Sequence, residues 1–255
     1  MMRLILGLAA LAWSAAGAYA GETAEAARYA ACMERARTTP AAGLAQAEAW
    51  LTEAETVAGR HCRAAALIGL GREEEAVAAL DALGRRLEES DPALAADLYH
   101  QAAMVWFEAG RLEAASALQD RALELAPESV ELLIDRALVQ AAGKDYAAAL
   151  QSLERARALA PARTDVLVLI ASAQRRLGHA DLAQESLESA LAIEPDNGAA
   201  LLERGILRRL GDDDEGARAD WERVRGLAPD SPEAATAAAN LKLLDEPAPA
   251  ESPLE

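Results

Sequence analysis

Residues 106–115 read Trp-Phe-Glu-Ala-Gly-Arg-Leu-Glu-Ala-Ala, and residues 121–127 read Arg-Ala-Leu-Glu-Leu-Ala-Pro. The alanine that ends the first segment and the proline that ends the second both recur every 34 residues. The alanines are Ala115, Ala149, Ala183 and Ala217, and the prolines are Pro127, Pro161, Pro195 and Pro229. A fixed period of this length predicts an array of helical repeats.

Further columns of similar side chains keep the same period. Small residues in the first half of each unit are Ala103, Ala137, Ala171 and Gly205, and the bulky residues four positions earlier are Tyr99, Leu133, Leu167 and Leu201. The second half contributes Ala122, Ala156, Ala190 and Val224, and, two residues before each proline, Leu125, Leu159, Ile193 and Leu227. Spacings of three, four and seven place these side chains on one helix face, so we expect them to pack between helices.

Each unit also has a break near its middle, where Gly110, Gly143, Gly178 and Gly211 lie. We expect each glycine to end the first helix in a left-handed conformation, which glycine adopts without strain. The proline column then stops the second helix. One helix pair cannot bury its apolar face alone, so neighbouring pairs must stack.

This pattern resembles the tetratricopeptide repeat, a family of 34-residue helix–turn–helix units. The resemblance covers residues 93–229 as four regular units and, more loosely, the preceding 70 residues. It implies an all-α fold, a right-handed α-solenoid of stacked helix pairs, with a capping helix at residues 230–245. Another solenoid of paired helices is the alternative. The family has an aromatic residue late in the first helix, which is Trp106 in the first unit but Gln140, Gln174 and Arg208 in the others. The large residue that the family has in the second helix is here Gln119, then Leu153, Leu187 and Trp221.

The N-terminus predicts export. Residues 1–20 combine a positive Arg3, an apolar run and the small-residue motif Ala18-Tyr-Ala20, which together indicate a signal peptide cleaved after Ala20. Arginine greatly outnumbers lysine and alanine is abundant, which favours a bacterial source and a periplasmic or secreted protein. An uncleaved membrane anchor is the alternative.

Residues 21–92 predict divergent helix pairs, and residues 246–255 predict a disordered tail. Cys32 and Cys62 fall in the first helices of the two N-terminal pairs, which are neighbours in the family that the chain resembles. In an oxidising compartment a solitary pair of cysteines predicts a disulfide. Two buried free thiols are the alternative.

Composition argues against several functions. The net charge of −17 disfavours nucleic acid and anionic membrane surfaces as partners. His61, His100 and His179 are dispersed, with no nucleophile motif beside them, and residues 212–215 lack the pattern of a calcium loop. We therefore expect no catalytic activity, no metal site, no cofactor and no stable membrane insertion after signal cleavage.

In the family, the first helices line a concave surface that holds peptides. Its groove columns fall on His100, Met104, Phe107, Ile134, Leu138, Val168, Arg175, Arg176, Leu202, Ile206 and Arg209. The middle of this set is apolar and its C-terminal end is basic, which favours a partner segment with apolar anchors and an acidic end. The carboxylate clamp of chaperone-binding relatives is absent, because apolar residues occupy its positions. The alternative is that the apolar members are covered and that the arginines pair with acids such as Glu203.

The sequence therefore predicts a non-catalytic scaffold or adaptor of the bacterial envelope that binds a protein segment in its groove. Self-assembly into a homo-oligomer is the alternative function, and carriage of a metal or cofactor is favoured less.

Overall fold

The computed structural model describes residues 23–245, and this part of the chain consists of thirteen α-helices and no strand. The first helices are α1 (Thr23–Thr38), α2 (Pro40–Glu53), α3 (Val57–Gly69) and α4 (Glu73–Leu87). They are followed by α5 (Pro92–Glu108), α6 (Leu112–Leu125), α7 (Val130–Ala142), α8 (Tyr146–Leu159), α9 (Thr164–Arg176), α10 (Ala180–Ile193), α11 (Gly198–Leu210), α12 (Asp214–Leu227) and α13 (Pro232–Asp245). The predicted export signal and the predicted C-terminal tail lie outside the described residues.

The chain forms two compact units, and the division between them falls between Leu83 and Gly84, within α4. The predicted domain boundaries remain predictions. None of the helices described is long and apolar enough to cross a membrane.

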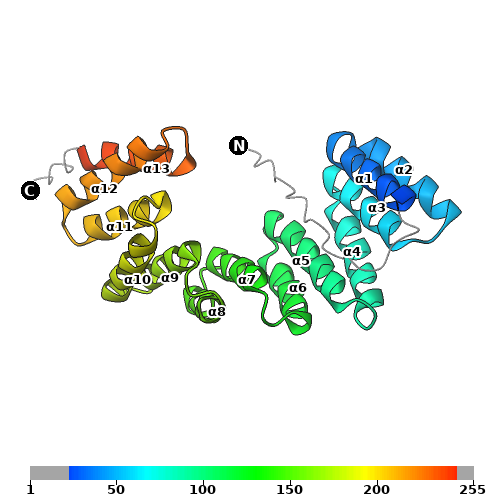
Figure 1. The fold of residues 1–255 in the computed structure, drawn as a ribbon, viewed down its shortest axis with the longest axis horizontal. Coiled ribbons are helices and arrows are strands. Elements are labelled where there is room, and N and C mark those ends of the chain that lie inside the picture. The colour runs from blue at the N-terminus through cyan, green and yellow to red at the C-terminus, as the bar shows by residue number, and fades with distance from the viewer. Residues whose placement is uncertain (1–22, 246–255) are drawn as a thin grey trace, which may run out of the picture. The chain divides into compact units, whose positions relative to one another are not determined.

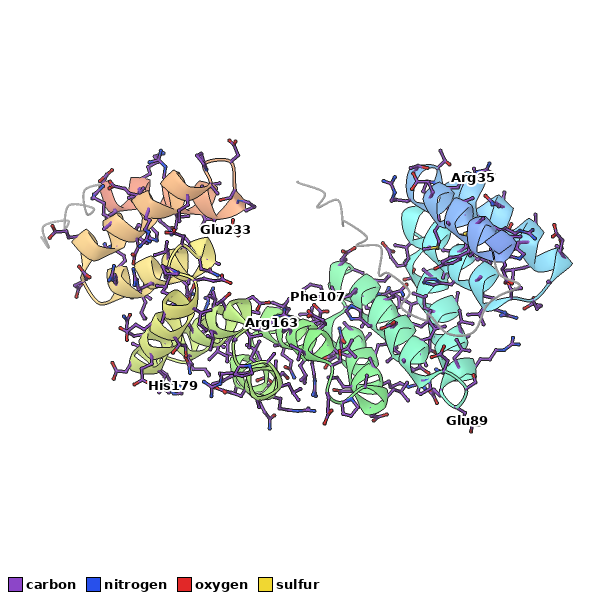
Figure 2. All side chains as sticks on the ribbon, in the orientation of Figure 1. Arg35, Glu89, Phe107, Arg163, His179 and Glu233 are labelled. Atoms are coloured by element: carbon purple, nitrogen blue, oxygen red, sulfur yellow. A yellow bond between two sulfur atoms is a disulfide. The ribbon has the colours of Figure 1, made fainter. Side chains whose placement is uncertain are left out.

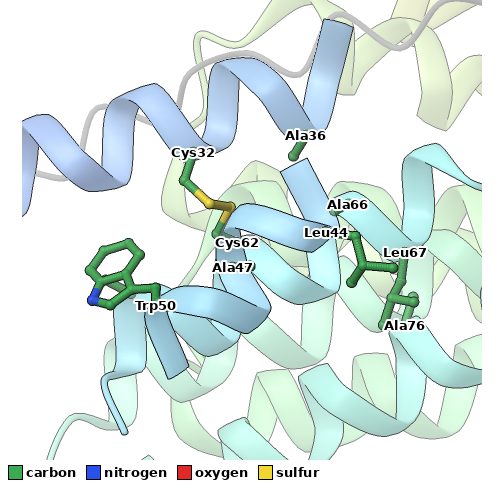
Figure 3. Packing of buried hydrophobic residues seen from close by; sticks show 10 residues of the cluster. Cys32, Ala36, Leu44, Ala47, Trp50, Cys62, Ala66, Leu67 and Ala76 are labelled. Carbon is green, nitrogen blue, oxygen red and sulfur yellow. A yellow bond between two sulfur atoms is a disulfide. The ribbon is translucent and has the colours of Figure 1, made fainter. Parts of the chain in front are cut away.

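In the N-terminal unit, α1, α2 and α3 pack around a small core that includes Leu44 and Trp50 (Figure 3). Cys32 of α1 and Cys62 of α3 are joined by a disulfide inside this core, and their Cα atoms lie 6.1 Å apart. This arrangement is compatible with the predicted pairing, because the two first helices are neighbours.

In the C-terminal unit, consecutive helices pack as the pairs α5–α6, α7–α8, α9–α10 and α11–α12, and α13 packs on α11 and α12. Figure 1 shows these helices following a bend, with α7 and α9 on its inner side and α6, α8 and α10 on its outer side. The all-α repeat fold is confirmed, and it turns the first-helix columns of successive repeats toward one surface.

The small and bulky columns are buried as predicted, with one exception. The aliphatic residues two positions before the prolines are exposed by 44% at Leu159, 49% at Ile193 and 43% at Leu227. Each is the last residue of its second helix, where the chain leaves the helix stack. The expectation that this column packs between helices was therefore wrong for these three residues, whereas Leu125 is half-buried.

The large residue of the second helix sets the size of the small residue opposite. Trp221 of α12 is buried against Gly205 of α11, and a Cβ atom on Gly205 would lie 2.4 Å from the indole Nε1. Repeats two and three instead combine alanine with leucine, at Ala137 with Leu153 and at Ala171 with Leu187. Glycine at 205 is thus needed for steric reasons.

The turn prediction was half correct. The left-handed residues are Gly110, Lys144, Gly178 and Asp212, which keep the 34-residue step. Gly143 and Gly211 lie one position earlier, with φ of −74° and −96°, because they are the first residues after their helices. In two of the repeats, therefore, a residue other than glycine adopts the left-handed backbone conformation, which strains it more than it would strain glycine.

Late in the first helix, the three residues that replace the aromatic residue of the family each form a hydrogen bond with the residue twelve positions later. The Ser152 and Ser186 hydroxyls each donate a 2.9 Å hydrogen bond to a glutamine Oε1, of Gln140 and Gln174 respectively. In the fourth repeat, Arg208 Nη1 donates to Asp220 Oδ2 at 2.8 Å. Each pair joins the two helices of one repeat, so a hydrogen bond replaces aromatic packing at this position.

Candidate functional site

The predicted groove residues lie on the four first helices of the C-terminal unit. They comprise His100, Met104 and Phe107 on α5, Ile134 and Leu138 on α7, Val168, Arg175 and Arg176 on α9, and Leu202, Ile206 and Arg209 on α11. The helix pairing therefore carries these columns along one surface of the repeat stack, which we call the first-helix surface.

The apolar members of this surface differ in how much of each side chain solvent reaches. Ile134 is buried, with 8% of its surface exposed, whereas Leu138, one turn further along α7, is 38% exposed. Val168 packs beside the core cluster of Leu167 and Leu187 and is half-buried. The surface thus has accessible apolar groups, although Ile134 belongs to the core.

The three arginines do not form the free basic end that the sequence suggested. Arg175 Nε donates to Glu203 Oε1 at 2.5 Å, and both side chains are largely buried. Arg209 forms an exposed ion pair with Asp214 at 2.9 Å. The alternative raised from the sequence, that groove arginines pair with nearby acids, holds for these two residues.

Arg176 is different. Its guanidinium carbon lies 5.7 Å from the centroid of the Tyr146 ring, and within residues 23–245 it forms no ion pair. Arg176 is exposed, so its hydrogen-bond donors remain available to a ligand.

A pocket of about 300 Å³ opens between α7, α8 and α9. Two predicted groove residues line it, Leu138 and Arg176. The remaining lining residues, which the sequence reading missed, are Ala137, Ala141, Ala142, Tyr146, Ala149, Leu153, Leu169, Ser172 and Ala173. The pocket could have been predicted from the small residues that the sequence places at the junction of the second and third repeats.

At the α5 end of the first-helix surface, His100 contacts two polar side chains. Its Nε2 lies 3.4 Å from Asp135 Oδ2, and its Nδ1 lies 3.3 Å from the amide nitrogen of the buried Gln119. Burial raises the pKa of the Asp135 carboxyl because it penalises the charged form, and the nearby His100 opposes this shift. The cluster therefore holds a carboxyl group that is costly to ionise.

The other histidines lie apart from this cluster. His61 Nδ1 lies 2.7 Å from the Tyr29 hydroxyl oxygen in the N-terminal unit, and His179 lies at the turn between α9 and α10, away from Phe107 (Figure 2). Across residues 23–245, no three histidine, cysteine or acidic side chains are grouped as metal ligands would be.

Comparison with known families identifies the repeat. A tetratricopeptide repeat model matches residues 96–129 and 164–197, two segments whose starts lie two 34-residue steps apart. These two segments are tetratricopeptide repeats. The hydrogen-bonded pairs of Gln140, Gln174 and Arg208 recur at one position of this 34-residue repeat.

Solved structures of tetratricopeptide proteins have the same fold. YrrB, described as a tetratricopeptide repeat protein with an unusual peptide-binding site, is 20% identical with a TM-score of 0.56, covering 76% of this chain and 96% of its own. MamA from Desulfovibrio magneticus RS-1 is 24% identical with a TM-score of 0.56, covering 66% of this chain and 93% of its own. No curated protein sequence matches this chain significantly.

Together, the repeat family and this fold support a protein–protein interaction scaffold. The tetratricopeptide surface that carries Leu138 and the pocket is the candidate site.

Proposed function

We propose that this protein is a non-catalytic scaffold of the bacterial envelope that binds an extended or helical segment of a partner protein on its first-helix surface. The observation that carries the proposal is the partly exposed apolar side chain of Leu138 at the edge of a pocket between α7 and α9. An accessible apolar group beside a pocket is the usual form of a ligand site.

The binding mechanism rests on burial and preorganisation. Helices α5 to α12 are held by their mutual packing, so a ligand does not have to order the surface that receives it. Each Å² of apolar surface removed from water stabilises the complex by roughly 25 cal/mol, so a few apolar anchors suffice for weak, specific binding. The peptide-binding site of YrrB lends support by analogy of fold.

The envelope location rests on the signal-like residues 1–20 and on the Cys32–Cys62 disulfide, a bond that persists in oxidising compartments. Fractionation of cells expressing the full chain, with N-terminal sequencing, tests it. We expect a periplasmic or secreted protein that begins at Gly21. A cytoplasmic protein that retains Met1 would overturn this part of the proposal.

Capture of a partner from envelope extract tests the binding function. Native protein is compared with Leu138→Glu, which places a charge at the pocket edge, and with Leu182→Glu, a matched change on α10 at a leucine that is also exposed. We expect one protein to be enriched by the native chain and by Leu182→Glu but lost with Leu138→Glu. Equal capture by all three proteins would move the binding site elsewhere.

Charge reversal at Arg175 is unsuitable for this test. It would place two carboxylates together in a largely buried position and so destabilise the fold, because Glu203 would lose its partner.

Self-assembly is a second candidate, which the exposed row of Leu159, Ile193 and Leu227 favours. It predicts a mass by light scattering that rises with protein concentration and returns to that of a monomer with Ile193→Glu. A constant monomer mass for the native protein would exclude it.

A further inference from the structure

We infer that the pocket between α7 and α9 receives a single bulky apolar side chain of the partner segment, and that Arg176 binds a carboxylate next to that side chain. This inference rests on the proposed function and specifies the chemistry of the segment that is bound.

The pocket exists because three small side chains meet at one junction. Ala141 occupies a position that holds Phe107 in the first repeat and arginine in the third and fourth, and Ser172 occupies one that holds Met104, Leu138 or Ile206 elsewhere. Ala142, also at the junction, aligns with a larger residue in every other repeat. The hollow is therefore specific to the second and third repeats and is not a property of the repeat itself.

The size and lining of the pocket select the occupant. Its volume of about 300 Å³ is at the lower end for ligand sites, which suits one side chain better than a folded element. The lining is mostly alanine and leucine, so an apolar group gains burial there, while a charged group would lose its hydration without compensation.

Arg176 supplies the polar half of the recognition. Unlike Arg175 and Arg209, it lacks an ion-paired acid within residues 23–245, and its guanidinium is positioned beside the Tyr146 ring at the pocket. A guanidinium presents paired donors that match a carboxylate. The chain as a whole is acidic, with a net charge of −17, so a carboxylate is attracted only when it lies close to Arg176.

A protein segment fits these features better than a second copy of this chain. Two copies that each carry a net charge of −17 repel one another. The pocket is lined from α7, α8 and α9, so a single projecting segment can reach it without the docking of a second solenoid. The bound segment should therefore carry leucine, isoleucine, methionine or phenylalanine within two residues of an aspartate or glutamate.

Variants borrowed from other repeats test the pocket itself. Ala141→Phe introduces the side chain of Phe107, and Ser172→Ile introduces that of Ile206, so both fill the pocket with residues that the same columns already tolerate. Arg176→Gln removes the charge. The matched controls are Ala117→Phe, at an exposed alanine of α6, and Arg223→Gln, at an exposed, ion-paired arginine of α12 outside the first-helix surface. Circular dichroism confirms the fold of each variant, and the two pocket-filling changes are independent in case one disturbs it.

The probe is a phage-displayed library of random dodecapeptides, selected on the purified native protein, followed by fluorescence anisotropy with labelled synthetic copies of the enriched peptides. We expect an apolar–acidic motif. Pocket filling and Arg176→Gln should each weaken binding roughly tenfold or more, which corresponds to the loss of about one charged hydrogen bond or one buried side chain. The controls should bind like the native protein.

A double-mutant cycle separates the charge contact from general effects. Replacing the acidic residue of the peptide by its amide should weaken binding to the native protein but not to Arg176→Gln. If peptides bind and neither pocket filling nor Arg176→Gln matters, the inference fails while the binding function stands. If no peptide is enriched, the inference also fails, and capture from envelope extract decides whether the binding function fails with it.

Discussion

Gly205 gives the sharpest test of how side-chain size is matched between the helices of one repeat. In Gly205→Ala, the new Cβ atom would lie 2.4 Å from Trp221 Nε1 and 2.7 Å from Cδ1, closer than non-bonded atoms approach. The indole must then move, although it is buried and its Nε1 donates a 3.2 Å hydrogen bond to the Leu202 carbonyl. The substitution therefore strains packing and disturbs a hydrogen bond at once.

The magnitude follows from three contributions. Overpacking a core costs about 1–3 kcal/mol. Loss of the indole hydrogen bond adds roughly 1 kcal/mol. Replacing glycine by alanine inside a helix returns about 0.5–1 kcal/mol. We expect a net loss of roughly 1–3 kcal/mol in the free energy of unfolding, measured by urea denaturation followed by circular dichroism.

The double variant Gly205→Ala/Trp221→Leu provides the control, because it recreates the alanine–leucine pair of the second and third repeats. Trp221→Leu alone leaves a cavity beside Gly205, and the added methyl group should partly fill it. The double variant should therefore be more stable than the sum of the two single changes by about 1 kcal/mol or more. Stability of Gly205→Ala at or above the native value, or strict additivity in the cycle, would refute the steric reasoning.

Four further changes have expected outcomes. Asp220→Ala leaves two arginines of α11 without their buried carboxylate and should cost about 3–5 kcal/mol in urea denaturation, whereas a loss under about 1 kcal/mol would contradict this role. Lys144→Gly removes a left-handed side chain and should raise stability by roughly 0.5–1 kcal/mol, and a lower melting temperature would count against it. Cys32→Ser/Cys62→Ser opens a loop with a sequence separation of 30 residues and should cost about 3–4 kcal/mol, and reductant should destabilise the native chain but leave this variant unchanged. Burial raises the pKa of Asp135 in the folded state, so the stability that its protonated form contributes is lost as pH rises through that pKa. Asp135→Asn should therefore be more stable than the native protein at pH 7, and the difference should vanish below about pH 3. A stability difference that stays unchanged at low pH would contradict the burial argument.

The repeat itself could be predicted almost completely from the sequence, because its columns express packing inside a single helix pair. Buried alanine recurs where the two helices of a pair approach closely, and a left-handed residue recurs in the turn of every unit. The two errors arose where position mattered more than residue type. Gly143 lies one residue before the turn position that Lys144 occupies, and Ile193 lies at the very end of its helix.

The candidate site was predicted only in outline, because it depends on contacts between repeats. The Arg175–Glu203 pair joins α9 to α11, so the sequence could raise it only as an alternative and could not decide it. The pocket depends on small side chains in two different repeats, Ala141 and Ser172, which become neighbours only after the helix pairs have stacked. The hydrogen-bonded pairs that replace the expected aromatic residue likewise required the geometry of both helices.

The central claim is that a partner protein contacts the first-helix surface at the pocket. A photo-crosslinking amino acid, p-benzoylphenylalanine, placed at the exposed Ala142 on the pocket rim and, as a control, at the exposed Ala117 on α6, tests this in living cells. Irradiation should produce a discrete crosslinked species from position 142 and none from position 117. Adducts from position 117 with none from position 142 would place the partner on another face and contradict the account.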